Sequence, residues 1–337
     1  MSSSLPVSTL APGFLKRLLA ALALGCALLP AHAFEVQGHR GARGLAPENT
    51  LPAFERALQV GVNTLELDVG LTADGVVVVS HDPALNPMIT RDAAGQWLPG
   101  KGPALRTLTL AQLQSYDVGA INPDTPYAKT FATQQPVPGT RVPTLASVFE
   151  RVKALGAEGV RFNIETKLSP AQPEETADPA TLTRALLSVI EQHGMADRVS
   201  IQSFDWRTLQ LVQQLAPRIP TAYLSIQTAN NDNIRDGTWT AGFRIADHAS
   251  LPAMVKAAGG TVWSPNGGAV TESLVKEAQT LGLKVIPWTI NNPADMERLI
   301  GWGVDGLITD YPDRLRVAMR SRGMPLPPSI AAADRRP

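Results

Sequence analysis

Short apolar runs rich in β-branched residues recur along the chain, and most are separated by segments with a 3.6-residue apolar period. The runs are Phe34–Gly38, Thr64–Val69, Arg161–Glu165, Val199–Gln202, Thr221–Leu224, Thr261–Trp263, Lys284–Thr289 and Asp305–Ile308. Strands that alternate with helices pair in parallel, and eight of them favour a closed ring. The pattern therefore predicts an α/β protein with a (β/α)8 TIM-type barrel over residues 34–316.

Helix boundaries support this division of the chain. An apolar stripe within residues 145–155 begins after Thr144, a capping residue, and ends at Gly156. A second helix is expected between Thr271 and Gly282. An open doubly wound sheet is the alternative, but it usually carries a Gly-rich phosphate loop after its first strand, and the sequence has no such motif.

One apolar run breaks the alternation. Val76–Ser80 follows Thr64–Val69 too closely for a parallel crossover, so the linking residues should form a hairpin about Asp74. This register places His81 opposite Leu67 and returns it to the end of the barrel where the parallel strands finish.

Two further segments lack the alternating pattern. Residues 83–143 are rich in Pro, Gly and Thr, with helical periodicity only near 105–113, and we expect an insertion over the barrel mouth. Long loops of this kind often act as lids or recognise substrate. Residues 317–337 contain a Pro-rich end and are predicted to be a disordered tail.

Residues 1–33 have the features of a cleaved export signal. Lys16 and Arg17 precede an apolar stretch, Leu18–Leu29, that is too short to span a bilayer. Ala31-His32-Ala33 then forms a small-residue cleavage site, so the mature chain should begin at Phe34. We expect an exported protein, periplasmic or extracellular.

The single cysteine, Cys26, lies inside that leader. It could be a lipid attachment site, but Ala23 stands where such a site favours Leu, so a small apolar leader residue is the preferred interpretation and no stable membrane anchor is expected. A mature chain without cysteine excludes disulfides and thiolate ligands. The leader holds two of the 30 basic residues and none of the 30 acidic ones. The resulting net charge of about −2 gives no reason to expect nucleic acid as a partner.

Three acidic residues are placed to act together. Glu66 and Asp68 are two apart on one strand and so share a face, and Glu165 ends the next parallel strand. Carboxylates this close repel unless a positive charge lies between them, and oxygen ligands suit Ca²⁺ or Mg²⁺. The alternative is a set of solvated charges, but residues that end barrel strands are usually functional.

Two histidines follow strands at the same end of the barrel. His39 ends the first strand and His81 ends the hairpin strand. They could serve as general acid and base or as metal ligands. His193 and His248 are expected to be structural.

Arg40 and Lys167 add positive charge beside these groups. They could bind phosphate or pair with the carboxylates. A divalent metal, two histidines and cationic side chains together suit cleavage of a phosphoric ester.

Residues 34–314 contain an ordered series of motifs. The first block comprises His39-Arg40-Gly41, Pro47-Glu48-Asn49-Thr50, Phe54, Ala57, Gly61, Glu66-Leu67-Asp68-Val69, Thr72, Asp74-Gly75 and His81-Asp82. The later motifs are Asn163-Ile164-Glu165-Thr166-Lys167, Gln202-Ser203-Phe204 and Trp288-Thr289. This series resembles the motifs of the glycerophosphodiester phosphodiesterases.

The resemblance implies a role for each of these residues. His39 and His81 would be the catalytic acid/base pair; Glu66, Asp68 and Glu165 would bind the metal; Arg40 and Lys167 would hold the phosphate; Trp288 would line the pocket; Glu48 and Asn49 would brace the His39 loop. The substrate would be a small glycerophosphodiester, split into glycerol phosphate and an alcohol such as choline or ethanolamine.

Two other functions stay open at this stage. A phospholipase D acting on lysophospholipids would need an apolar entrance, for which Met88, Ile89, Trp97 and Leu98 are the candidates. A non-catalytic binding protein on the same barrel would be expected to have lost some of the histidines and carboxylates, and here all of them are present.

Overall fold

The computed structural model of the chain describes residues 1–4, 33–229 and 231–330. The chain divides into two units, Met1–Ala33 and Phe34–Pro337, and the account that follows concerns the second. Cys26 and most of the expected leader fall within 5–32, outside the described residues.

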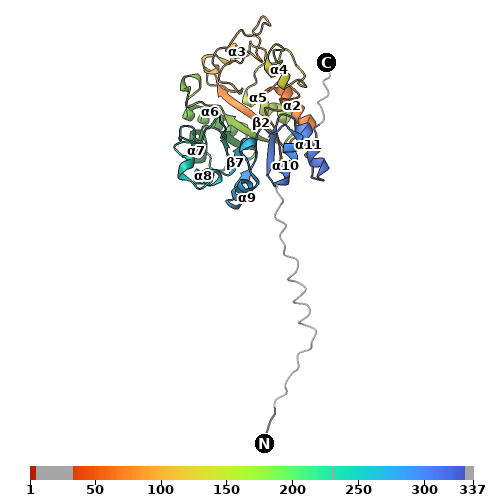
Figure 1. The fold of residues 1–337 in the computed structure, drawn as a ribbon, viewed down its shortest axis with the longest axis vertical. Helices are drawn as coiled ribbons and strands as arrows, with labels where there is room; N and C mark the ends of the chain where they lie inside the picture. The colour runs from red at the N-terminus through yellow and green to blue at the C-terminus, as the bar shows by residue number, and fades with distance from the viewer. Residues whose placement is uncertain (5–32, 230, 331–337) are drawn as a thin grey trace. The chain divides into compact units, whose positions relative to one another are not determined.

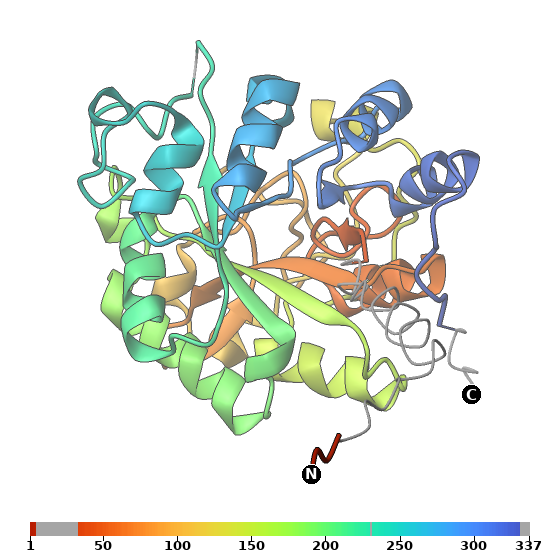
Figure 2. The ribbon, with the colours of Figure 1, turned by 90° about the horizontal axis from the view of Figure 1, so that it is seen from below.

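Eight parallel strands form a nearly closed barrel with helices around its outside (Figure 2). The strands, in sheet order, are β8 (Lys284–Val285), β7 (Val262–Pro265), β6 (Thr221–Ser225), β5 (Val199–Ser203), β4 (Arg161–Thr166), β2 (Thr64–Leu71), β1 (Glu35–Gly38) and β9 (Gly306–Thr309). The ring closes between β9 and the residues that follow β8, where the Ile308 amide donates to the Pro287 carbonyl at 3.0 Å. The predicted (β/α)8 architecture is confirmed.

The two helices predicted from their capping residues are both present. The helices of the barrel are α2 (Leu51–Val60), α5 (Leu145–Ala154), α6 (Pro179–Gln192), α7 (Trp206–Leu215), α8 (Leu251–Ala257), α9 (Glu272–Thr280), α10 (Pro293–Gly301) and α11 (Pro312–Ser321). The Thr144 hydroxyl accepts from the amide of Ser147, and Thr271 caps α9 in the same way. Each hydroxyl satisfies an amide that the first helical turn leaves without a partner.

Strand β8 is shorter than the predicted run Lys284–Thr289. Pro287 has no N–H, so it cannot donate to a neighbouring strand, and the regular strand ends at Val285. The chain nevertheless keeps its course along the barrel, because the Trp288 amide still donates to the Pro265 carbonyl at 3.0 Å.

The hairpin forms as expected. Strand β3 (Val77–Val79) pairs antiparallel with β2, with Val79 opposite Val69. The Ser80 amide donates to the Asp68 carbonyl at 3.0 Å and carries the pairing one step further. The next residue, His81, therefore follows the predicted register.

The two faces of strand β2 lie in different environments. On β2, the odd-numbered apolar residues join the main core with residues of the helices, whereas Glu66 and Asp68 lie on the opposite face. Around β1, β2, β4 and β5 the barrel interior is a buried polar network, in which the Asn163 amide donates to Gln37 and Gln202 and the Gln202 amide donates to Glu66. The other half is apolar and contains Ala222, Val262, Ile286 and Ile308.

Residues 83–143 contain two short helices, α3 (Leu110–Leu113) and α4 (Pro126–Thr130), which lie at the same end of the barrel in Figure 1. This insertion has a separate apolar cluster, in which Leu85, Leu105, Leu113, Val118 and Val142 pack with Val78 of β3. A segment with its own core can hold a fixed shape beside the barrel.

The expectation of a disordered tail is wrong for residues 317–330. Helix α11 continues to Ser321, and the Ile330 amide then donates to the Leu58 carbonyl at 2.9 Å. Side chains of Met324, Leu326 and Ile330 pack against the main core. Apolar residues spaced between the prolines give this segment a face to bury, which the Pro-rich composition concealed. Residues 331–337 lie outside the described part.

Candidate active site

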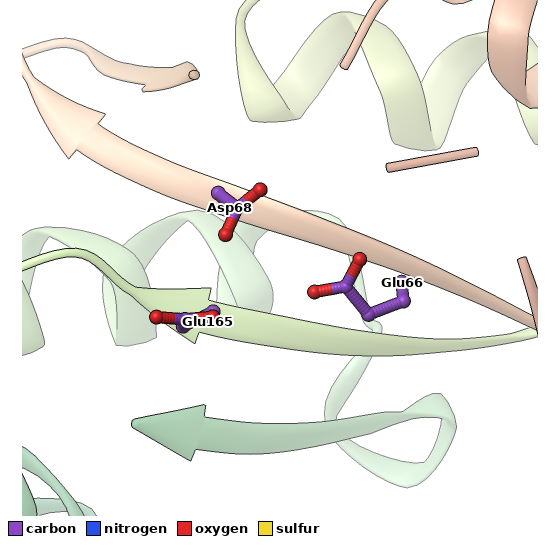
Figure 3. A group of neighbouring side chains, drawn as sticks. All are labelled: Glu66, Asp68 and Glu165. Carbon is purple, nitrogen blue, oxygen red and sulfur yellow. The ribbon is translucent and has the colours of Figure 1, made fainter. Parts of the chain in front are cut away.

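Neighbouring strands bring the three carboxylates together. Asp68 on β2 pairs with Glu165 on β4. Glu66 is two residues before Asp68 on β2, so the two side chains share one face of the strand. One carboxylate oxygen from each lies within 4.8 Å of the other two. Figure 3 shows the three side chains grouped on the two neighbouring strands. Their exposed fractions are 1% for Glu66, 1% for Asp68 and 7% for Glu165, so water screens their charges weakly.

Hydrogen bonds hold two of these carboxylates in place. Glu66 accepts from the Arg40 backbone amide and from the Gln202 side-chain amide, both at 2.7 Å. Asp68 accepts from the Asn49 side-chain amide at 2.8 Å. These donors fix the carboxylates before any ligand arrives, which lowers the cost of ordering them around an ion.

Lys167 places a positive charge beside two of the three carboxylates. Its Nζ lies 2.7 Å from Glu165 Oε1 and 3.6 Å from Asp68 Oδ1. Burial alone would raise the pKa of Asp68, but Lys167, His81 and Arg40 outweigh it and hold that pKa below its usual range. Asp68 is therefore ionised at neutral pH.

Burial dominates at the other two carboxylates, even though Lys167 pairs with Glu165. Burial and the charge of Asp68 raise the pKa of Glu66 well above its ordinary value. Burial, with a further contribution from Asp68, raises the pKa of Glu165 to about 7. Three buried carboxylates that converge in this way match the donor set of a hard divalent cation.

His39 is fixed by a residue that the sequence analysis missed. Its Nδ1 lies 2.7 Å from Asp310 Oδ1, and its Nε2 lies 3.9 Å from Glu66 Oε2. An ionised Asp310 only accepts hydrogen bonds, so Nδ1 carries the proton and the Nε2 lone pair faces the carboxylates. Burial, with help from Arg43, lowers the pKa of His39 to about 4, which keeps the ring neutral at pH 7.

Asp310 is itself held by several donors. Arg43 donates to it through Nε at 2.7 Å and Nη2 at 3.0 Å, and the Asn291 amide donates at 2.6 Å. His39 and Arg43 outweigh burial and hold the pKa of Asp310 below its usual range. The signal in the sequence is its position: Asp310 directly follows β9, as His39 follows β1.

His81 has a similar partner. Its Nδ1 lies 2.9 Å from Asp82 Oδ1, and the Asn86 amide donates to the other Asp82 oxygen at 2.7 Å. Burial, with the charges of Lys167 and Arg40, lowers the pKa of His81. Both predicted histidines therefore have a neighbouring carboxylate at Nδ1.

The loop after β1 has an unusual backbone. Arg40 and Asn49 adopt positive φ angles of 49° and 55°, which are costly for residues with side chains. The Asn49 amide donates to the Arg40 carbonyl at 3.0 Å, and Glu48 accepts from Arg40 Nη1 at 2.6 Å. Glu48 and Asn49 thus make the bracing contacts that the resemblance implies.

A cavity of about 180 Å³ collects most of these side chains. It is lined by His39, Arg40, Arg43, Glu66, His81, Glu165, Lys167, Gln202, Phe204, Leu224, Trp288, Thr289 and Ile308. Of the eight predicted site residues, Asp68 alone is not a lining residue; it lies 3.5 Å from Arg40 Nε and 3.6 Å from Lys167 Nζ, and both of these residues line the cavity. Trp288 and Phe204 meet edge to face at 5.2 Å and form an aromatic wall.

The other two histidines lie elsewhere. The His193 ring contacts Phe149 at the end of α6, and the His248 ring stacks on Phe243. Neither lines the cavity, in agreement with the structural roles expected for them.

Residues 39–314 match the profile of the glycerophosphoryl diester phosphodiesterase family. The chain belongs to this family. The match contains every candidate site residue, from His39 to Asp310. It confirms the resemblance seen in the motifs and the assignment as a phosphoric diester hydrolase.

Curated relatives agree with the family assignment. A glycerophosphodiester phosphodiesterase of Caldanaerobacter subterraneus subsp. tengcongensis is 30% identical over 86% of this chain and 98% of its own. One from Bacillus subtilis is 32% identical over 82% of this chain and 83% of its own. The similarity therefore covers most of both proteins in each comparison.

Solved structures share the fold. A Silicibacter pomeroyi protein assigned as a glycerophosphoryl diester phosphodiesterase has a TM-score of 0.79 and 37% identity, covering 87% of this chain and 95% of its own. An Oleispira antarctica phosphodiesterase, solved with the product sn-glycerol-3-phosphate, has a TM-score of 0.61 and 25% identity, covering 84% and 96%.

Proposed function

We propose that this phosphodiesterase hydrolyses small glycerophosphodiesters to sn-glycerol 3-phosphate and an alcohol, using a divalent metal and two histidines. The observation that carries the proposal is a cavity of about 180 Å³ lined by two histidines and by two members of the three-carboxylate group. The sn-glycerol-3-phosphate bound to the related Oleispira enzyme supports this choice of product.

Glu66, Asp68 and Glu165 would hold the metal, either Ca²⁺ or Mg²⁺. When bound, such an ion would neutralise a phosphoryl oxygen and stabilise the negative charge that develops during hydrolysis. The raised pKa values of Glu66 and Glu165 support this assignment, because a bound cation would allow both buried carboxyls to ionise.

Arg40 and Lys167 would hold the phosphodiester. Both side chains are largely buried and line the cavity, so their charges act with little screening by water. Arg40 is anchored through Nη1 on Glu48, and its Nη2 would bind the phosphate. Lys167 would shift from the carboxylates toward the phosphate as positive charge arrives beside them.

The histidines would move the protons. With Nδ1–H donated to Asp310, His39 presents the Nε2 lone pair to the cavity. One histidine would remove a proton from the attacking water or the neighbouring glycerol hydroxyl, and the other would protonate the departing alkoxide.

Trp288 and Phe204 would pack against the carbons of the glycerol. The Trp288 indole N–H donates to the Ser264 carbonyl at 2.9 Å, so the ring offers the cavity an apolar surface. This wall complements the charged residues that β1, β2 and β4 bring to the same cavity.

The lysophospholipid alternative gains no support. Leu98 packs against the insertion's own cluster, and the Trp97 ring lies 5.2 Å from the Arg91 guanidinium. Met88 and Ile89 are also only partly accessible, so none of the four candidates is an exposed large apolar side chain.

Choline release from glycerophosphocholine and from lysophosphatidylcholine, measured side by side with purified enzyme, tests the substrate class. We expect turnover of glycerophosphocholine and at most slow turnover of the lysolipid. A preference for lysophosphatidylcholine would contradict the proposal. An enzyme that hydrolyses neither substrate would also contradict it.

We also propose that the protein is exported and that cleavage leaves Phe34 at its amino terminus. The basis is the sequence of residues 1–33. Among the described residues, no helix combines the length and apolar character needed to cross a bilayer. Amino-terminal sequencing of exported protein should begin at Phe34, whereas an acylated chain beginning at Cys26 would show a lipoprotein.

A further inference from the structure

The insertion is bonded to the loop that carries His39 and Arg40. The Thr133 hydroxyl donates to the Gly44 carbonyl at 2.8 Å, and the Gln134 amide donates to the Arg43 carbonyl at 2.7 Å. These contacts follow directly after helix α4. The insertion is therefore in direct contact with the active-site loop.

Tyr127 on α4 makes the contact nearest the chemistry. Its hydroxyl donates to Glu48 Oε2 and accepts from Arg43 Nη1 at 3.2 Å. One turn later, the Phe131 ring lies 4.6 Å from the Arg43 guanidinium and meets the Tyr127 ring edge to face at 4.8 Å. The directions are fixed, because a carboxylate only accepts and a guanidinium only donates.

Two chains of hydrogen bonds start at this hydroxyl. The first runs through Glu48 to Arg40 Nη1. The second runs through Arg43 to Asp310, which holds His39 Nδ1. One phenol of the insertion thus joins the guanidinium assigned to phosphate and the imidazole assigned to proton transfer.

We propose that Tyr127 is a positioning residue that couples docking of the insertion to the placement of Arg40 and His39. This inference rests on the proposed function of those two residues. It gives the insertion a defined role, because the site is complete only when α4 lies against the loop after β1. No contact between Tyr127 and substrate is required.

Coupling of this kind is reciprocal. If docking of α4 favours phosphate binding, phosphate binding must favour docking to the same extent. Adding sn-glycerol 3-phosphate should then slow amide hydrogen exchange across residues 126–135. Loss of the Tyr127 hydroxyl should remove this ligand effect, because a phenyl ring cannot bond Glu48 or Arg43.

The experiment compares wild type, Tyr127→Phe and the matched control Tyr116→Phe. Tyr116 belongs to the same insertion but packs against its apolar cluster. We expect Tyr127→Phe to lower kcat/KM for glycerophosphocholine by roughly 10- to 100-fold, the range for lost hydrogen bonds to charged groups. Its ligand-induced protection of 126–135 should disappear, while the control keeps both properties.

Three outcomes separate this inference from the proposed function. If Tyr127→Phe keeps the ligand-induced protection and the kcat/KM of the wild type, the role of Tyr127 is overturned and the proposed function of the enzyme is unaffected. If Tyr127→Phe loses protection of residues 126–135 equally with and without ligand, and its kcat/KM is normal, the inference is also overturned. The Tyr127 contact is then purely structural. A wild-type enzyme without activity would reject the proposed function, while the exchange measurement would still decide the coupling.

Discussion

His39 Nδ1 lies 2.7 Å from Asp310 Oδ1, and this pair joins the first barrel strand to the last. The two residues are 271 positions apart but become neighbours because β1 pairs with β9 in the ring. The pairing of β1 with β9 therefore determines which nitrogen of His39 faces the three carboxylates.

Asp310→Asn should lower kcat by roughly 10²–10⁴-fold with little change in KM. The amide can donate to Nδ1 and so favour the tautomer with its proton on Nε2, which blocks proton uptake. Steady-state kinetics with glycerophosphocholine measures the effect. Asp205→Asn is the matched control, since Asp205 is also buried and follows strand β5. Equal losses in both variants would point to general damage instead.

His39→Ala and His81→Ala should each reduce turnover by roughly 10²–10⁴-fold while metal binding survives. If the two act as a unit, the double variant should be little worse than either single one. His193→Ala and His248→Ala are the controls and should remain near wild type. Loss of bound metal in His39→Ala would show that His39 is a ligand.

The fold was predictable from the sequence because strand runs and helix caps are local signals. The site was predictable wherever one strand places residues at spacing two, as with Glu66 and Asp68. Asp310 escaped notice because its role depends on the pairing of β1 with β9, which brings it to His39 through space. Tyr127 escaped for a similar reason: it lies in an insertion without periodicity, and its partners are 79 and 84 residues away.

Metal affinity should rise with pH through about pH 7. In the metal-free protein, the raised pKa values of Glu66 and Glu165 mean that both carboxyls hold protons that a metal must displace. A carboxyl whose folded pKa exceeds its unfolded value also makes the metal-free fold less stable as pH rises through that interval. The increase in Tm on adding Ca²⁺ or Mg²⁺ should therefore be larger at pH 8 than at pH 5.5.

Glu66→Gln tests the same assignment at one residue. It should weaken metal binding, measured by calorimetry at pH 8, while the far-ultraviolet circular dichroism stays that of the wild type. A metal affinity that is independent of pH and unchanged in this variant would place the ion elsewhere.

Truncation after Gly323 should destabilise the barrel. It removes the packing of Met324, Leu326 and Ile330, each worth about 1 kcal/mol as a partly buried apolar side chain. It also removes the Pro327 carbonyl that accepts from Arg316. Urea unfolding measures the loss, with truncation after Ile330 as the control. Equal stability of the two truncated chains would show that residues 324–330 contribute nothing.

The most direct test of the central claim is ³¹P NMR of glycerophosphocholine incubated with enzyme stripped of metal, before and after Ca²⁺ or Mg²⁺ is restored. The account predicts no product without metal, and with metal the signal of sn-glycerol 3-phosphate. Full turnover by protein whose metal content is shown to be nil would contradict it, as would a product in which the phosphate stays on choline.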